Sequence, residues 1–122
     1  MRLNHIDLQV PDVQETAVFF ERWFAFEHVS NRHSPSVAIL RGDGDFTLVL
    51  QRRADDERYP EGFHVGFLLD DVREVLSFHA RAREAGLSIS DVQHTGRGTL
   101  TYLRGPGVLI EVSCRARVGE RP

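Results

Sequence analysis

Residues 62–71, GFHVGFLLDD, form a short apolar run with a histidine near its start and two aspartates at its end. Side chains alternate between the two faces of a β-strand, so every second residue from Phe63 to Leu69 lies on one wholly apolar face. The opposite face holds His64, Gly66 and Leu68. This pattern predicts a strand with a hydrophobic core on one side and a cavity on the other.

The same pattern occurs 59 residues earlier, in residues 4–12, NHIDLQVPD. There His5 and Asp7 alternate with aliphatic residues, and Asp12 stands where Asp71 stands in the later copy, at the expected start of a helix. Two copies of one pattern predict a duplicated structural unit, in which each copy places a histidine at the start of its first strand.

Hydrophobic periodicity predicts the same order of elements in both halves of the chain. The first half is expected to form a strand at 2–10, a helix at 13–25 and strands at 26–30, 37–41 and 46–51. The second half is expected to form a strand at 63–69, a helix at 72–85 and strands at 87–92, 99–104 and 108–113. The order βαβββ, repeated twice, predicts an α+β fold whose two units curl into a half-open, mostly antiparallel barrel.

At 122 residues the chain is expected to form one domain, residues 1–122. A charged segment that is almost free of aliphatic residues separates the halves and indicates a linker. The expected boundaries are 1–52 for the first unit, 53–61 for the linker, 62–115 for the second unit and 116–122 for a polar tail.

Composition excludes several classes of partner and chemistry. A net charge of −3 and a pI near 6.0 argue against nucleic acid and against an anionic membrane surface. No apolar run approaches the roughly 20 residues that span a bilayer. The single cysteine cannot form an internal disulfide, which favours the cytoplasm. The chain contains arginine but no lysine, so Schiff-base chemistry through lysine is excluded and arginine is the cationic side chain left for holding an anion.

Three groups of motifs resemble those of one family. They are NHI at 4–6 with VPD at 10–12, HVGF at 64–67 with DDV at 70–72, and YLRGPGVLIE at 102–111. By these motifs, which extend over nearly the whole chain, the protein resembles the vicinal oxygen chelate superfamily of glyoxalase I, extradiol dioxygenases, fosfomycin-resistance enzymes and bleomycin-binding proteins. The resemblance implies the two-unit fold given above, whereas it leaves the reaction open because this superfamily hosts many chemistries.

The resemblance also implies four metal-binding positions, in the first, fourth, fifth and eighth strands. His5, His64 and Glu111 fill three of them. The turn before the fourth strand is one residue longer than its counterpart, so Glu111 pairs with Val49 rather than Gln51, and valine cannot bind a metal. Two histidines and one carboxylate make a facial-triad set, which leaves positions open for substrate. One divalent ion is expected, with iron, manganese, nickel and zinc as the candidates.

Each of these residues also has an ordinary structural interpretation. A single histidine at the start of a strand, such as His5, is more often a satisfied polar residue than a ligand. Glu111 lies in the apolar strand 108–113, where a carboxylate needs a partner, and a metal or an arginine is the usual one. Tyr102 is expected to face the cavity and to act there with Glu111 in catalysis, although a packed aromatic side chain explains it equally well.

The remaining candidates are weaker. Asp7, Val49, Gln51 and Tyr102 are expected to contact the substrate. His94 and Arg97 fall before the seventh strand, near a possible cavity mouth, and are interpreted as a solvated loop. Cys114 alternates with Glu111 and is expected to be a buried thiol on the opposite face.

The leading hypothesis is a metalloenzyme, a dioxygenase, lyase or epoxide-opening transferase, that acts on a small substrate with two adjacent oxygens. Glyoxalase I chemistry is disfavoured because Val49 replaces a carboxylate. Epoxide opening has its own difficulty, since Asp7 stands where the fosfomycin-resistance branch is expected to have threonine. The alternative is a metal-free protein that sequesters a drug or metabolite, and an accessory domain is a third possibility. A homodimer is expected in either of the first two cases.

Overall fold

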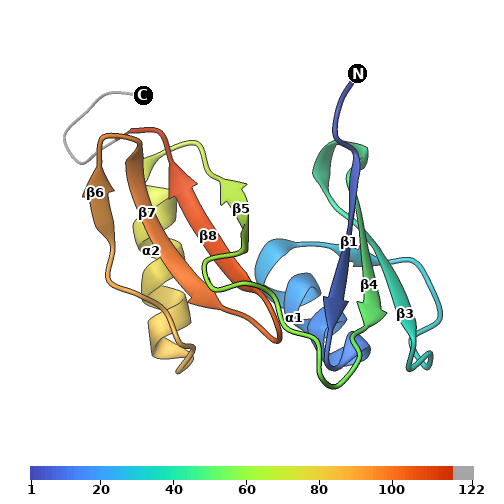
Figure 1. The fold of residues 1–122 in the computed structure, drawn as a ribbon. Helices are drawn as coiled ribbons and strands as arrows, with labels where there is room; N and C mark the ends of the chain where they lie inside the picture. The colour runs from blue at the N-terminus through green and yellow to red at the C-terminus, as the bar shows by residue number, and fades with distance from the viewer. Residues whose placement is uncertain (117–122) are drawn as a thin grey trace. The chain divides into compact units, whose positions relative to one another are not determined.

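The structure is a computed structural model that describes residues 1–116, so the end of the expected tail, residues 117–122, lies outside the described residues. The chain forms two compact units that meet in sequence between Arg58 and Tyr59 (Figure 1). This boundary falls inside the expected linker at 53–61.

The first unit contains one mixed four-stranded sheet and one α-helix among its described residues. Its elements are β1 (His5–Val10), α1 (Val13–Phe24), β2 (Glu27–His28), β3 (Val37–Arg41), the short 3₁₀ helix η1 (Asp43–Asp45) and β4 (Thr47–Arg52). The strand order is β1-β4-β3-β2, in which β1 runs parallel to β4 and the other neighbours are antiparallel.

The second unit repeats this arrangement. Its elements are β5 (His64–Leu68), α2 (Val72–Glu84), β6 (Gln93–Thr95), β7 (Gly98–Arg104) and β8 (Leu109–Cys114). The strand order within the described residues is β5-β8-β7-β6, again with one parallel pair, β5 and β8. The predicted α+β fold of two βαβββ units is therefore confirmed, and most strand pairs are antiparallel. Each sheet is open, with an edge strand on either side.

Both helices begin with the aspartate cap that the sequence predicts. The Oδ1 atom of Asp12 accepts a hydrogen bond of 3.0 Å from the backbone N–H of Glu15, and Asp71 does the same for Glu74. Each cap satisfies a backbone donor that would otherwise lack a partner in the first helical turn. Among residues 1–116, neither helix has the length and apolar character needed to cross a membrane.

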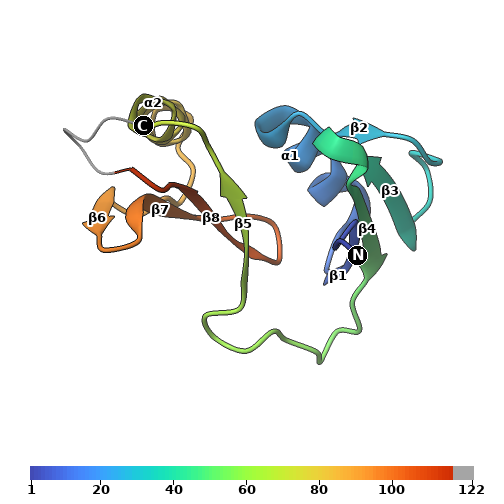
Figure 2. The same ribbon diagram turned by 90° about the horizontal axis from the view of Figure 1, so that it is seen from above.

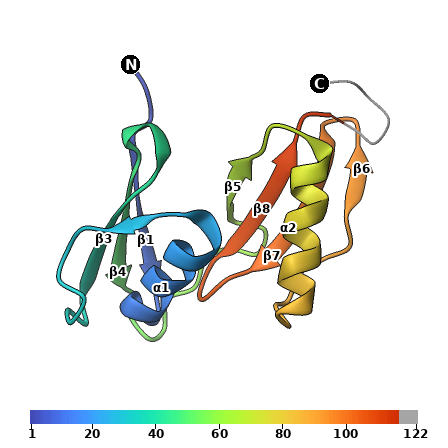
Figure 3. The same cartoon turned by 180° about the vertical axis from the view of Figure 1, so that it is seen from behind.

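Each helix covers one face of its own sheet, as Figures 2 and 3 show. In the second unit, α2 packs against β7 and β8. The fully buried side chains come from the helix and from the two strands, and they include Val75, Leu103, Ile110 and Val112. Because side chains alternate along a strand, the residues between these buried ones face away from the helix. That second face is where the candidate residues lie.

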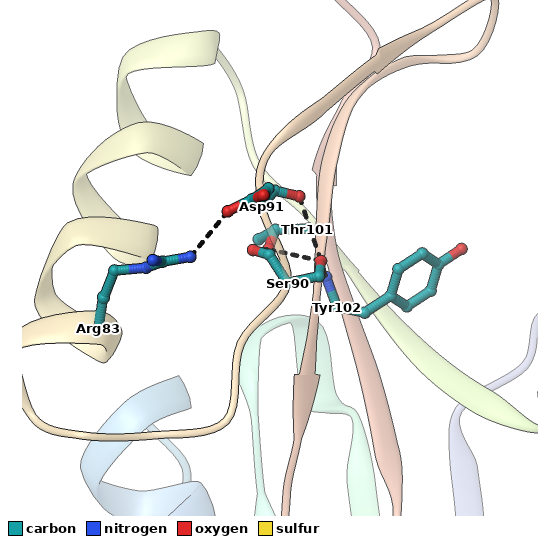
Figure 4. Close-up of polar contacts among 5 residues, drawn as sticks. All are labelled: Arg83, Ser90, Asp91, Thr101 and Tyr102. Carbon is teal, nitrogen blue, oxygen red and sulfur yellow. Dashed lines mark hydrogen bonds and ion pairs between the residues drawn. The ribbon is translucent and has the colours of Figure 1, made fainter.

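The sixth strand is the clearest correction to the sequence-based prediction. The structure places β6 at Gln93–Thr95, not at 87–92. The earlier segment does run beside β7, but only one isolated bridge forms there, between Ile89 and Leu103. The Ser90 hydroxyl accepts from the backbone N–H of Tyr102 at 2.9 Å (Figure 4). A side-chain oxygen thus takes the place of a backbone carbonyl and interrupts the regular ladder.

Other differences concern the ends of strands. The first strand begins at His5 rather than at residue 2, and the second is reduced from 26–30 to Glu27–His28. The residues that follow β2 form a loop, and Arg32 of this loop bonds to α1. The guanidinium of Arg32 bonds both carboxylate oxygens of Glu21 at 2.9 Å, and this hydrogen bonding holds the pKa of Glu21 below its usual value.

Candidate metal and substrate site

The open face of the second unit gathers four residues from three neighbouring strands. Gly66 of β5 lies opposite Glu111 of β8, which in turn lies opposite Tyr102 of β7. His64 lies two residues before Gly66 and therefore on the same face. The sheet register alone thus brings together His64, Tyr102 and Glu111, which the sequence predicted as site residues.

Tyr102 contacts both of the expected metal ligands in this unit. Its hydroxyl donates a hydrogen bond of 3.0 Å to the Oε1 atom of Glu111. Its ring also lies edge-on to the imidazole of His64, with the ring centroids 5.5 Å apart and the planes at 84°. Both neighbours are therefore held by one half-buried aromatic side chain.

A backbone carbonyl fixes the tautomer of the His64 imidazole. Its Nδ1 atom lies 2.8 Å from the backbone carbonyl oxygen of Gly62. A carbonyl oxygen can only accept, so Nδ1 must be the protonated nitrogen. In the neutral ring, Nε2 then keeps its lone pair, and an Nδ1–H bonded to a carbonyl is the usual arrangement behind a metal-binding histidine.

The Tyr102 and Arg97 contacts of Glu111 are both made by the same carboxylate oxygen. The side chain of Glu111 is 14% exposed, and Oε1 is paired both with Tyr102 and with the Nη2 atom of Arg97 at 3.7 Å. Oε2 lies over Gly66, where an added Cβ would come within 3.4 Å of it. The glycine therefore leaves space beside the oxygen that a ligand-binding carboxylate would use.

The sequence did not predict the contact between Arg97 and Glu111. Arg97 lies in the turn between β6 and β7 and was interpreted there as part of a solvated loop. Its backbone is indeed in a turn, and its side chain is 72% exposed, but its guanidinium pairs with Glu111. His94 was also expected in that loop and instead belongs to β6, where Nδ1 lies 3.0 Å from the hydroxyl of Thr99.

The first unit places its candidates on the matching face. The Nδ1 atom of His5 lies 2.8 Å from the amide oxygen of Asn4, so its Nε2 is also the nitrogen left open in the neutral ring. The carboxylate of Asp7 accepts hydrogen bonds from the side-chain amides of Gln9 and Gln51. These residues form a polar row on the exposed side of the sheet.

Val49 stands in the first unit where Glu111 stands in the second. Asp7 lies opposite Val49 in the parallel pair of β1 and β4, as Gly66 lies opposite Glu111 in β5 and β8. The offset between the two halves at this point is therefore 62 residues, and Gln51 lies two pairs further along, opposite Gln9. An aliphatic side chain stands at the fourth candidate position.

The candidate ligands belong to different units: His5 to the first, His64 and Glu111 to the second. Among residues 1–116, no three His, Cys, Asp or Glu side chains come close enough together to hold a metal ion. Cys114 is 1% exposed and lies on the helix-covered face of β8, as the alternation with Glu111 predicts.

Known proteins share both the sequence pattern and the fold. The family profile described as Glyoxalase/Bleomycin resistance protein/Dioxygenase superfamily matches residues 2–112. A solved structure of a possible glyoxalase from Bacillus cereus is 30% identical, with a TM-score of 0.84 over 93% of this chain and 99% of that one.

Two further solved structures share the fold at lower identity. Lactoylglutathione lyase from Agrobacterium tumefaciens is 20% identical, with a TM-score of 0.74 over 93% of this chain and 92% of the other. An E126Q variant of the fosfomycin resistance protein FosX from Listeria monocytogenes, in complex with Mn(II) and 1S,2S-dihydroxypropylphosphonic acid, is also 20% identical, with a TM-score of 0.74 over 93% and 91%. Among curated proteins, none matches this chain significantly.

The profile match extends over nearly all of the chain, and the duplicated βαβββ units agree with it. The chain belongs to the Glyoxalase/Bleomycin resistance protein/Dioxygenase superfamily.

Proposed function

We propose that this protein is a metalloenzyme that holds one divalent ion through His5, His64 and Glu111 and acts on a small substrate with two adjacent oxygens. The observation that supports this most directly is the arrangement around Tyr102. One side chain contacts both His64 and Glu111, the hydrogen bond of the histidine to Gly62 is made by Nδ1, and the Tyr102 and Arg97 contacts of the carboxylate are both made by Oε1.

The donor set fits a divalent ion of the iron, manganese, nickel or zinc type. Two neutral imidazoles and one carboxylate satisfy such ions and leave coordination positions for a bidentate substrate. When bound, the ion would supply a Lewis acid that stabilises negative charge developing on substrate oxygen. The FosX variant with Mn(II) shows that a member of this fold can bind such an ion, which supports the proposal for this chain.

The chain's own residues would orient the substrate. The hydroxyl of Tyr102 donates its proton to Glu111 on the same open side, so it can accept a hydrogen bond from a substrate hydroxyl, or donate to a substrate oxygen once it releases Glu111. Asp7 and Gln51 lie on the corresponding face of the first unit, where Val49 stands opposite Asp7. Because Val49 can neither bind a metal nor accept a proton, dioxygenase, lyase or epoxide-opening chemistry is favoured over that of glyoxalase I.

A homodimer is part of the proposal, since closed symmetric dimers are the commonest oligomers and His5 lies in a different unit from the other two ligands. Metal binding by a refolded mixture of two variants, His5→Ala and His64→Ala, distinguishes pairing of the units within one chain from pairing between two chains. The two variant proteins are unfolded, mixed and refolded together before metal is added. If first and second units pair between chains, mixed dimers contain one complete site and part of the metal binding returns. If they pair within a chain, none returns.

Metal analysis of wild-type protein purified without chelator tests the proposed function. We expect near-stoichiometric divalent metal, or uptake of added Mn²⁺ with a gain of about 2.7 kcal/mol in the free energy of unfolding at 100 times the Kd. A protein that is empty and also refuses added metal would contradict the proposal.

That second outcome would favour the alternative function, a metal-free protein that sequesters a drug or metabolite in cytoplasm. One observation supports it: Glu111 already has two protein partners, the Tyr102 hydroxyl and the Arg97 guanidinium. A carboxylate satisfied in this way does not need a metal. Binding of bulky drugs would then be the property to measure.

A further inference from the structure

Arg97 forms an ion pair with Glu111, the carboxylate that is proposed to bind the metal. Glu111 is largely shielded, with 14% of its side chain exposed, so its negative charge is incompletely solvated. Two groups compensate it at Oε1: the Tyr102 hydroxyl at 3.0 Å and the Arg97 guanidinium at 3.7 Å. The first is a hydrogen bond, whereas the second is a charge contact at longer range.

Arg97 is held loosely in comparison with Tyr102. Its side chain is 72% exposed and projects from the turn between β6 and β7. Its backbone is fixed by a 3.1 Å hydrogen bond from its N–H to the hydroxyl of Thr95, so the turn stays in place when the side chain moves. An exposed arginine can exchange a carboxylate for water at small cost, because ion pairs at the surface are weak.

We propose that Arg97 competes with the metal for Glu111. Its guanidinium compensates the negative charge of the carboxylate until a divalent cation displaces it. This inference rests on the proposed function, since it takes Glu111 as a metal ligand. A divalent ion bound to the carboxylate and a guanidinium beside the same carboxylate repel each other, and this repulsion falls with distance and with salt. The arginine therefore weakens metal binding and keeps the carboxylate paired in the metal-free protein.

The test is a titration of Arg97→Gln and wild-type protein with Mn²⁺, in which free Mn²⁺ is measured by electron paramagnetic resonance. We expect Arg97→Gln to bind Mn²⁺ about 10-fold more tightly at low salt, because the competing positive charge is gone. The advantage should shrink to about twofold in 1 M salt, where the Debye length is about 3 Å. Arg97→Lys keeps the charge and should stay within about threefold of wild type.

Arg73→Gln is the matched control. It makes the same change in net charge on α2, which covers the other face of this sheet, and its side chain is 92% exposed. Its Mn²⁺ affinity should equal that of wild type, so a tightening shared by both glutamine variants would overturn the inference in favour of a general charge effect.

The remaining outcomes separate this inference from the proposed function. If wild type binds Mn²⁺ and Arg97→Gln binds it no more tightly, the competition is overturned while the metal site stands. If neither protein binds Mn²⁺ or any other added divalent metal, and wild type as purified holds none, both are overturned. Binding by Arg97→Gln alone would support the competition in its strongest form.

Discussion

Replacing His64 with alanine is expected to lower the affinity for Mn²⁺ by at least about 100-fold, since loss of a residue that merely orients a ligand already costs 10- to 100-fold. The imidazole is positioned from two sides, by the Gly62 carbonyl at 2.8 Å and by the ring of Tyr102. Alanine removes the Nε2 lone pair that would bind the metal, whereas the hydrogen bond between Tyr102 and Glu111 uses no atom of His64. The measurement is metal content after dialysis, followed by titration with Mn²⁺.

The matched control is His94→Ala. His94 belongs to the same unit and is also exposed, but it pairs with Thr99, which belongs to the helix-covered face. Its loss should leave Mn²⁺ affinity within about twofold of wild type, because no ligand is removed. Equal affinities for wild type and His64→Ala, or equal losses in both alanine variants, would rule out His64 as a specific ligand.

Replacing Gly98 with alanine is expected to destabilise the protein by on the order of 3–5 kcal/mol. Gly98 begins β7 with a φ of +126°, a conformation that other residues rarely adopt. A Cβ added there would lie 2.0 Å from the carbonyl oxygen of Cys114 and 2.9 Å from the backbone of Arg115. Backbone on the neighbouring strand cannot move aside as a flexible side chain can. Urea denaturation followed by circular dichroism measures the loss.

Gly96→Ala provides the comparison within the same turn. Nothing lies within 4 Å of the Cβ that would be added at Gly96, and its φ is outside the left-handed range. We expect its free energy of unfolding to change by no more than about 0.5 kcal/mol. If the two alanine variants were equally stable, the close approach of β8 to Gly98 would not matter for stability.

The fold could be predicted from sequence because the two units repeat the same signals. Alternation of apolar residues gives the strand at 37–41 with the bounds that the structure has, and both aspartate caps mark where the helices start. The sixth strand could not be found in this way. Residues 87–92 alternate as a strand does, whereas Gln93–Thr95 is short, polar and defined only by its pairing with β7.

The sequence could predict the site residues that lie on strands, because their positions follow from counting along the two repeats. Counting residues in the two halves makes Val49 the counterpart of Glu111, and the ladders agree, because Val49 lies opposite Asp7 as Glu111 lies opposite Gly66. The role of Arg97 depends on where a turn directs a long side chain, which no periodicity encodes. The sequence did indicate that Glu111 needs a metal or an arginine as partner, without identifying the arginine.

Cys114 gives this protein an internal reporter of local opening. It is the single cysteine of the chain, it is 1% exposed, and its thiol donates to the carbonyl of Ala116 at 3.2 Å. A thiol reagent reaches such a group only while the surrounding structure is transiently open. The rate of alkylation under native conditions therefore measures how often the end of β8 separates from its neighbours, with no engineered label.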